Sequence, residues 1–144
     1  MSAFSDFGFG RTDIPHYYGD LVRQLFIAVA VVWVAGDAVY GGYLLPLSLP
    51  AQLMALLLLI VLAALTGPHG RVVMLLNAIA AALGVFVIEL FALPAQSTEP
   101  TIMLLLQELM AFFLIFALYY SIKTLRAYAT GKLGHLNPPE EFGR

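Results

Sequence analysis

The sequence predicts an all-α membrane protein, with four transmembrane helices in an up-down bundle and both termini in the cytoplasm. The prediction depends on the composition and on the breaks between apolar runs. Of the 144 residues 61% are hydrophobic and only 11% are charged, and Gly- and Pro-containing breaks divide the chain into four apolar runs. A soluble domain carries roughly 25% charged residues. A multi-span protein embedded in the lipid bilayer is therefore the class that fits.

The expected spans are residues 21–45, 50–66, 71–94 and 101–125. Gly41-Gly42 and Pro46 end the first span, and Pro50 suits the first position of the second helix. The second span carries no charged residue, so we expect it to face lipid on most sides.

Two flanking segments complete the domain organisation. The N-terminal segment 1–20 is glycine-rich and aromatic, which suits a position at the level of the lipid headgroups. The C-terminal segment 126–144 reads as a polar tail. The spans themselves, residues 21–125, form a single transmembrane domain with no room for a second folded domain.

The positive charges predict the orientation. With four spans, both termini and the connection between spans two and three share one side of the membrane. All seven Lys and Arg residues fall on that side: Arg11, Arg23, Arg71, Lys123, Arg126, Lys132 and Arg144. Positively charged flanks favour the cytoplasm. We therefore expect a multi-pass protein of the cell membrane with cytoplasmic termini.

Three carboxylates stand inside the apolar runs. With a helical rise of about 1.5 Å per residue, Asp37 lies roughly 21 Å beyond Arg23, Glu89 roughly 27 Å beyond Arg71, and Glu108 roughly 22 Å beyond Lys123. All three are thus expected in the outer half of the membrane. No Lys, Arg or His of this chain shares that half.

We expect spans one, three and four to turn these acids inward into one pocket, with span two completing the bundle from the lipid side. Small residues at helical spacing beside Glu89, such as Ala78 and Ala82, favour close helix approach. Three acids in one apolar pocket cannot all stay ionised, because desolvation and mutual repulsion raise carboxylate pKa values.

Three roles for the acids follow from this arrangement. They could be protonated and hydrogen-bonded to one another, to Gln107 or to backbone, and so fix the helix packing, and some could reach toward the lipid headgroups. They could carry a cation or a proton, since intramembrane acids commonly mark such pathways. They could also bind a basic or polar partner helix.

Asn77 and Trp33 each allow two interpretations. For Asn77 an interhelical hydrogen bond is favoured over a place on a polar path from Glu89 to the cytoplasm. For Trp33, the single tryptophan, a place in the packed core is favoured over a gate.

Other chemistry finds little support in the sequence. Cysteine is absent, and no phosphate-binding loop, nucleophile elbow or zinc-protease helix is present. No basic stripe suits nucleic acid. His16, His69 and His135 match no metal motif, so the metal content stays unknown. We expect no enzyme activity and no cofactor.

The favoured function is handling of a cation or proton by Asp37, Glu89 and Glu108, with Asn77 and Gln107 as polar partners. Because one four-helix bundle is thin for enclosing a path, we expect a homo-oligomer or a membrane-complex partner. The alternative is a non-transporting structural or accessory subunit of a membrane complex, whose acids serve helix packing or partner binding.

Overall fold

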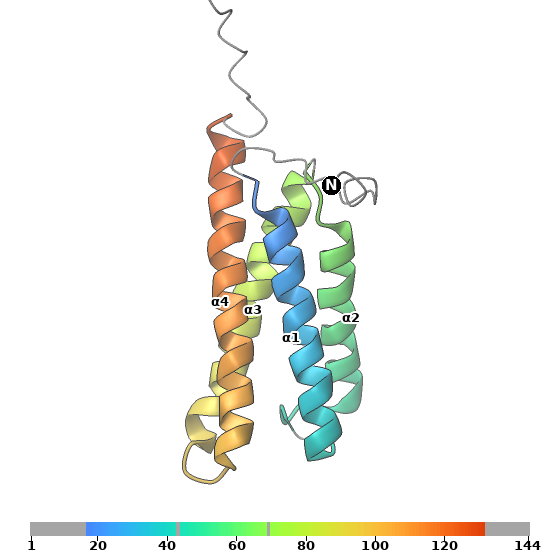
Figure 1. The fold of residues 1–144 in the computed structure, drawn as a ribbon, viewed down its shortest axis with the longest axis vertical. Helices are drawn as coiled ribbons and strands as arrows, with labels where there is room; N and C mark the ends of the chain where they lie inside the picture. The colour runs from blue at the N-terminus through green and yellow to red at the C-terminus, as the bar shows by residue number, and fades with distance from the viewer. Residues whose placement is uncertain (1–16, 43, 69, 132–144) are drawn as a thin grey trace, which may run out of the picture.

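The computed structural model describes residues 17–42, 44–68 and 70–131. They form four helices: α1 (Gly19–Tyr40), α2 (Leu49–Leu65), α3 (Arg71–Ala95) and α4 (Thr101–Ala129). The predicted N-terminal segment and C-terminal tail lie mostly outside the described residues. The chain runs up and down through the four helices as one elongated bundle (Figure 1). The predicted all-α fold with four helices is confirmed.

Three of the helices are long and apolar enough to cross a membrane. The exception is α2, an apolar helix of 17 residues, which corresponds to a length of roughly 26 Å. The described Lys and Arg residues all lie toward one end, here called the basic end: Arg23, Arg71, Lys123 and Arg126. The opposite end carries the connections 41–48 and 96–100 and is called the acidic end.

The first helix ends earlier than predicted. It stops at Tyr40, five residues short of the expected boundary, because Gly41 adopts a left-handed conformation with φ of 65°. The residues that follow return into the bundle, where Leu44 and Leu45 are fully buried. We expected the connection between the first two helices at the membrane surface. Part of it instead fills the core of the bundle at the acidic end.

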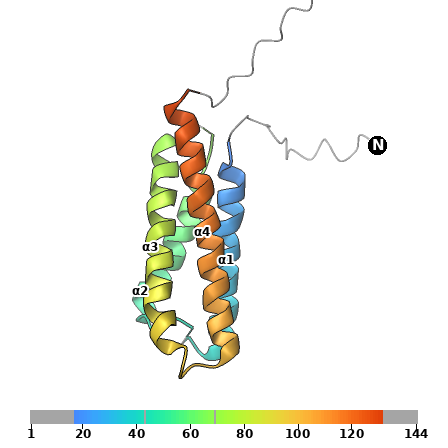
Figure 2. The ribbon, with the colours of Figure 1, turned by 90° about the vertical axis from the view of Figure 1, so that its left-hand side faces the viewer.

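The packing is centred on α4. This helix packs extensively against α3 and α1, whereas α2 packs mainly on α1 and contacts α3 little. With the view turned by 90°, α4 lies between α3 and α1, with α2 behind (Figure 2). The predicted lipid-facing character of α2 agrees with its exposed apolar side chains: Leu49, Leu53, Met54, Leu57, Leu58, Ile60, Val61 and Leu65.

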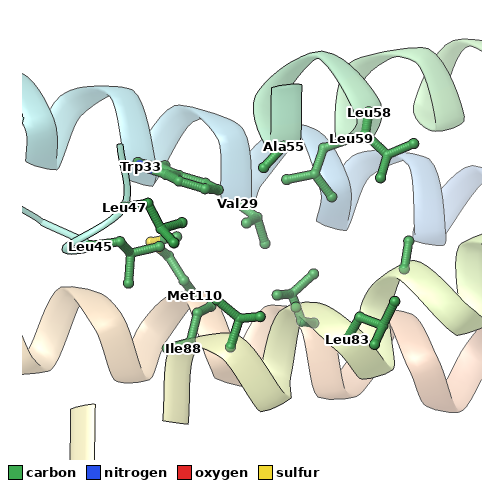
Figure 3. A pocket seen from close by; sticks show the side chains of 14 residues that line it. Val29, Trp33, Leu45, Leu47, Ala55, Leu58, Leu59, Leu83, Ile88 and Met110 are labelled. Atoms are coloured by element: carbon green, nitrogen blue, oxygen red, sulfur yellow. The ribbon is translucent and has the colours of Figure 1, made fainter. Parts of the chain in front are cut away.

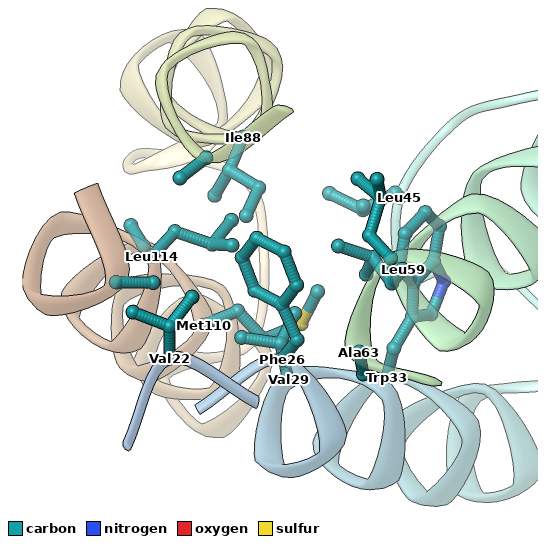
Figure 4. Close-up of a cluster of buried hydrophobic side chains, with 14 of the residues drawn as sticks. Val22, Phe26, Val29, Trp33, Leu45, Leu59, Ala63, Ile88, Met110 and Leu114 are labelled. Atoms are coloured by element: carbon teal, nitrogen blue, oxygen red, sulfur yellow. The ribbon is translucent and has the colours of Figure 1, made fainter. Parts of the chain in front are cut away.

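A continuous apolar core fills the space between the helices. Phe26 of α1 and Met110 and Leu114 of α4 lie at its centre, and Ile88 reaches them from α3 (Figure 4). Trp33 is 5% exposed and belongs to the same cluster. Its predicted place in the core is confirmed.

Candidate functional site

Asp37 stands in the last turns of α1 and serves the connection that follows. Its side-chain Oδ1 accepts a hydrogen bond from the backbone N–H of Leu44 at 3.2 Å. Its backbone carbonyl accepts another from Gly42 at 2.8 Å. The carboxylate is half-buried. Because a buried backbone N–H needs an acceptor, Asp37 stabilises the turn by accepting the hydrogen bond of Leu44.

Two amide side chains hold the same connection from other helices. Gln107 of α4 is buried, and its Nε2 donates to the carbonyl of Leu44 at 2.6 Å. Gln52 of α2 donates to the carbonyls of Gly42, Leu45 and Leu47 at 3.0 to 3.2 Å. We call Asp37, Gln52 and Gln107 the loop clamp. Since Leu44 binds both Asp37 and Gln107, two of the predicted site residues meet here.

Gln52 was missed by sequence reasoning. The only signal was a long polar side chain near the start of an otherwise apolar helix. Such an amide costs free energy in an apolar setting unless it is hydrogen-bonded. Its position near a Pro- and Gly-containing connection could have indicated the carbonyls that it binds.

Glu108 lies on the outside of the bundle. It is exposed, and so are Phe112, Ile115 and Tyr119, which share its helix face. The prediction that Glu108 projects inward is therefore wrong. The reason is local, because neighbouring helix residues point about 100° apart. Gln107 takes the inward direction, so Glu108 is turned outward.

Glu89 is half-buried. On the same side of α3, Ala78 and Ala92 are buried, whereas Ala82 is exposed. The position thus lies between the packed face and the surface. Since α3 and α4 are antiparallel and joined by a short connection, Glu89 and Glu108 stand at a similar level along the bundle.

From helical periodicity we place the two glutamates on the same flank of the α3–α4 contact. The other flank of α4 is occupied by α1, since the Tyr18 ring just before α1 packs on Tyr120 with ring centroids 5.4 Å apart and the rings tilted by 35°. The other flank of α3 faces α2. Helical periodicity then turns both glutamates toward the side of the α3–α4 contact that neither α1 nor α2 covers. We call Glu89 and Glu108 the glutamate pair.

The three acids are therefore not gathered into one pocket. Asp37 belongs to the loop clamp, and the glutamate pair lies on the outer flank of α3 and α4. The described part of the chain contains no group of three His, Asp or Glu side chains that could hold a metal ion. His16, His69 and His135 lie outside the described residues.

Asn77 forms the interhelical hydrogen bond that was predicted for it. The side chain is fully buried, and its Nδ2 donates to Thr66 Oγ1 at the end of α2, at 2.8 Å. The Thr66 hydroxyl in turn donates to the carbonyl of Leu62 at 2.6 Å. Between Asn77 and Glu89, α3 carries only apolar residues. These residues supply no polar step between the two.

Aromatic contacts close the basic end. The backbone N–H of Tyr18 donates to Thr124 Oγ1 at 3.2 Å, and Lys123 Nζ lies 4.6 Å from the centre of the Tyr18 ring. Burial, with a further contribution from Asp20, raises the pKa of Tyr17 to about 12. The Tyr17 hydroxyl is thus neutral at physiological pH, as its buried position requires.

Comparison with known protein families, curated proteins and solved structures found no match for this chain.

Proposed function

We propose that this chain is a multi-pass protein of the cell membrane that assembles with a partner through the glutamate pair. Both termini would lie in the cytoplasm, because the basic end carries all the described cations and basic flanks favour that side. The acidic end would then lie toward the outer surface. The exposure of Glu108 is the single observation that carries the proposal.

The energetics of an exposed acid support a partner. A charged side chain costs about 3 kcal/mol at the centre of a membrane helix on insertion scales, which is an upper bound for Glu108 in the outer half of α4. No Lys or Arg lies in the spans near the level of Glu108, so a second copy could not neutralise it by charge. A partner helix with a Lys or Arg in its outer half would remove the cost. The exposed rings of Phe112, Phe116 and Tyr119 offer that helix an apolar contact surface.

A synthetic transmembrane helix provides the test. Two poly-leucine peptides, one with a Lys in the outer half and one with a Lys in the inner half, are reconstituted with the full chain, and association is measured by energy transfer between fluorophores. We expect association with the outer-half Lys only, and its loss in Glu108→Gln. Glu99→Gln, in the α3–α4 connection, is the matched control. Equal association of both peptides, or association with the outer-half Lys peptide that survives Glu108→Gln, contradicts the proposal.

Cation or proton handling is a second candidate. It is favoured by one observation, the presence of two carboxylates at a similar level on one free flank, where a second copy could enclose them. Flux of protons and of cations is measured in liposomes for wild type, Glu89→Gln and Glu108→Gln. Asp37→Asn is a useful comparison because that acid is engaged by the loop. Wild-type flux no higher than that of empty liposomes rules this candidate out.

A further inference from the structure

An apolar crevice opens between α2 and α3. Its volume is about 240 Å³, and it occupies the stretch where these two helices contact each other little. Side chains from all four helices and from the α1–α2 connection line it (Figure 3). Val29 and Trp33 form part of one wall, Ile88 and Met110 part of another, and Leu45 and Leu47 lie near one end.

The crevice faces the lipid. Leu58 of α2 and Leu83 of α3 both line it, and they are 52% and 59% exposed. A residue that lines the crevice and is also exposed must stand at its mouth. In a bilayer that mouth opens sideways, into the hydrocarbon.

Water is a poor occupant of this space. A buried water needs two to four polar partners, and the lining consists of aliphatic side chains, Gly84, Met110 and the Trp33 ring. An empty crevice is also unfavourable, because its walls lose their dispersion contacts. Apolar cavities of about 150 Å³ already bind molecules as large as benzene. This one is larger and elongated, since its α3 residues run from Ala80 to Ile88, roughly 12 Å along the helix.

We infer that the crevice binds one hydrocarbon chain of a bilayer lipid, which enters between Leu58 and Leu83. The bound group is an alkyl chain, and the lining offers no charged side chain to select a headgroup. This lipid site is separate from the glutamate pair, which lies on the opposite flank of α3. It goes beyond the proposed function and stands or fails independently of it.

Trp33 provides a direct probe of occupancy. It is the only tryptophan of the chain and lines the crevice, yet it is 5% exposed. Bromine quenches indole fluorescence at short range, so variants that fill the crevice separate a chain bound inside it from lipid around the bundle. The full chain is reconstituted in phosphatidylcholine vesicles with brominated acyl chains and in matching unbrominated vesicles. We expect loss of most of the Trp33 emission in the brominated lipid.

Filling the crevice should protect Trp33. Ala80→Phe and Ala55→Phe each place a ring in the space, from α3 and α2 respectively, and should restore most of the emission. Ala82→Phe, two residues away on the exposed side of α3, is the matched control and should be quenched like wild type. Circular dichroism checks that each variant keeps its helices, and two filling variants guard against misfolding of either.

Three results would overturn the inference. The first is wild-type emission that is the same in brominated and unbrominated vesicles. The second is equal quenching of wild type and of both filling variants when all are folded. Quenching that disappears as the protein-to-lipid ratio rises would also count against it, because a second copy would then be covering the crevice.

Discussion

At the scale of single residues, Gln107 and Glu108 show that two neighbouring polar residues of one helix can face opposite environments, the core and the surface. Both are polar and both stand at the same depth, but only one can face the core. The amide points inward, because it can donate to the carbonyl of Leu44. The carboxylate of Glu108 faces outward. Burying the neutral amide costs less than burying a charged group.

Gln107→Leu tests this role. The change removes the donor for a buried carbonyl, and we expect the free energy of unfolding in detergent to fall by about 1 to 3 kcal/mol. Gln96→Leu is the control, since Gln96 is exposed at the acidic end. An unchanged free energy of unfolding in Gln107→Leu would show that the hydrogen bond to Leu44 contributes nothing.

Asn77 and Thr66 form a pair that a double-mutant cycle can measure. We expect Asn77→Ala and Thr66→Ala each to destabilise the protein, with a coupling free energy of about 1 kcal/mol, in the range of interhelical hydrogen bonds in membranes. Chemical unfolding of the single and double variants gives the coupling. Additive effects of the two changes would mean that the 2.8 Å contact carries no net interaction.

At the scale of elements, the α1–α2 connection behaves as part of the core. Leu44 packs closely on Gly36 of α1, where an added Cβ would lie 2.5 Å from the Leu44 side chain. Because Leu44 is fully buried, it has little room to move aside. The absence of a side chain at Gly36 is therefore what allows the connection to return into the bundle.

Gly36→Val should displace the α1–α2 connection from the core, because the added side chain would overlap Leu44. We expect a loss of about 1 to 3 kcal/mol in the free energy of unfolding, as for other overpacked cores. Ala35→Val, at the exposed neighbouring position, is the control and should change little. A second readout is proteolysis at residues 41–48, which should speed up in Gly36→Val alone. Equal stability of the two variants would contradict the packing argument.

At the scale of the whole molecule, the absence of cysteine makes the orientation easy to test. Single cysteines at Ser48, Ser97 and Thr130 all stand at exposed positions. A maleimide that cannot cross membranes should label Ser48→Cys and Ser97→Cys on intact cells. It should label Thr130→Cys only after permeabilisation. The reverse pattern would invert the proposed orientation.

The helices and their order could be predicted because apolar runs and Gly or Pro breaks are local features of the sequence. The Asn77 hydrogen bond was predictable for a similar reason, since a buried amide has few alternatives. The direction of Glu108 was not predictable, because depth along a helix says nothing of its rotation. The weak packing of α2 on α3 was not predictable from the sequence either. Uniformly apolar helix surfaces do not specify which pairs of helices pack closely.

One consequence concerns α2. Near its start Gln52 ties it to three backbone carbonyls, and at its end Thr66 binds Asn77. Just beyond, Pro68 accepts a hydrogen bond from Tyr128 of α4. Between these points α2 holds to α3 by few contacts. A helix that is tethered at both ends, packed on α1 and held loosely on its α3 side can move away from α3 without breaking either tether, so lateral pressure on that side would change its curvature first.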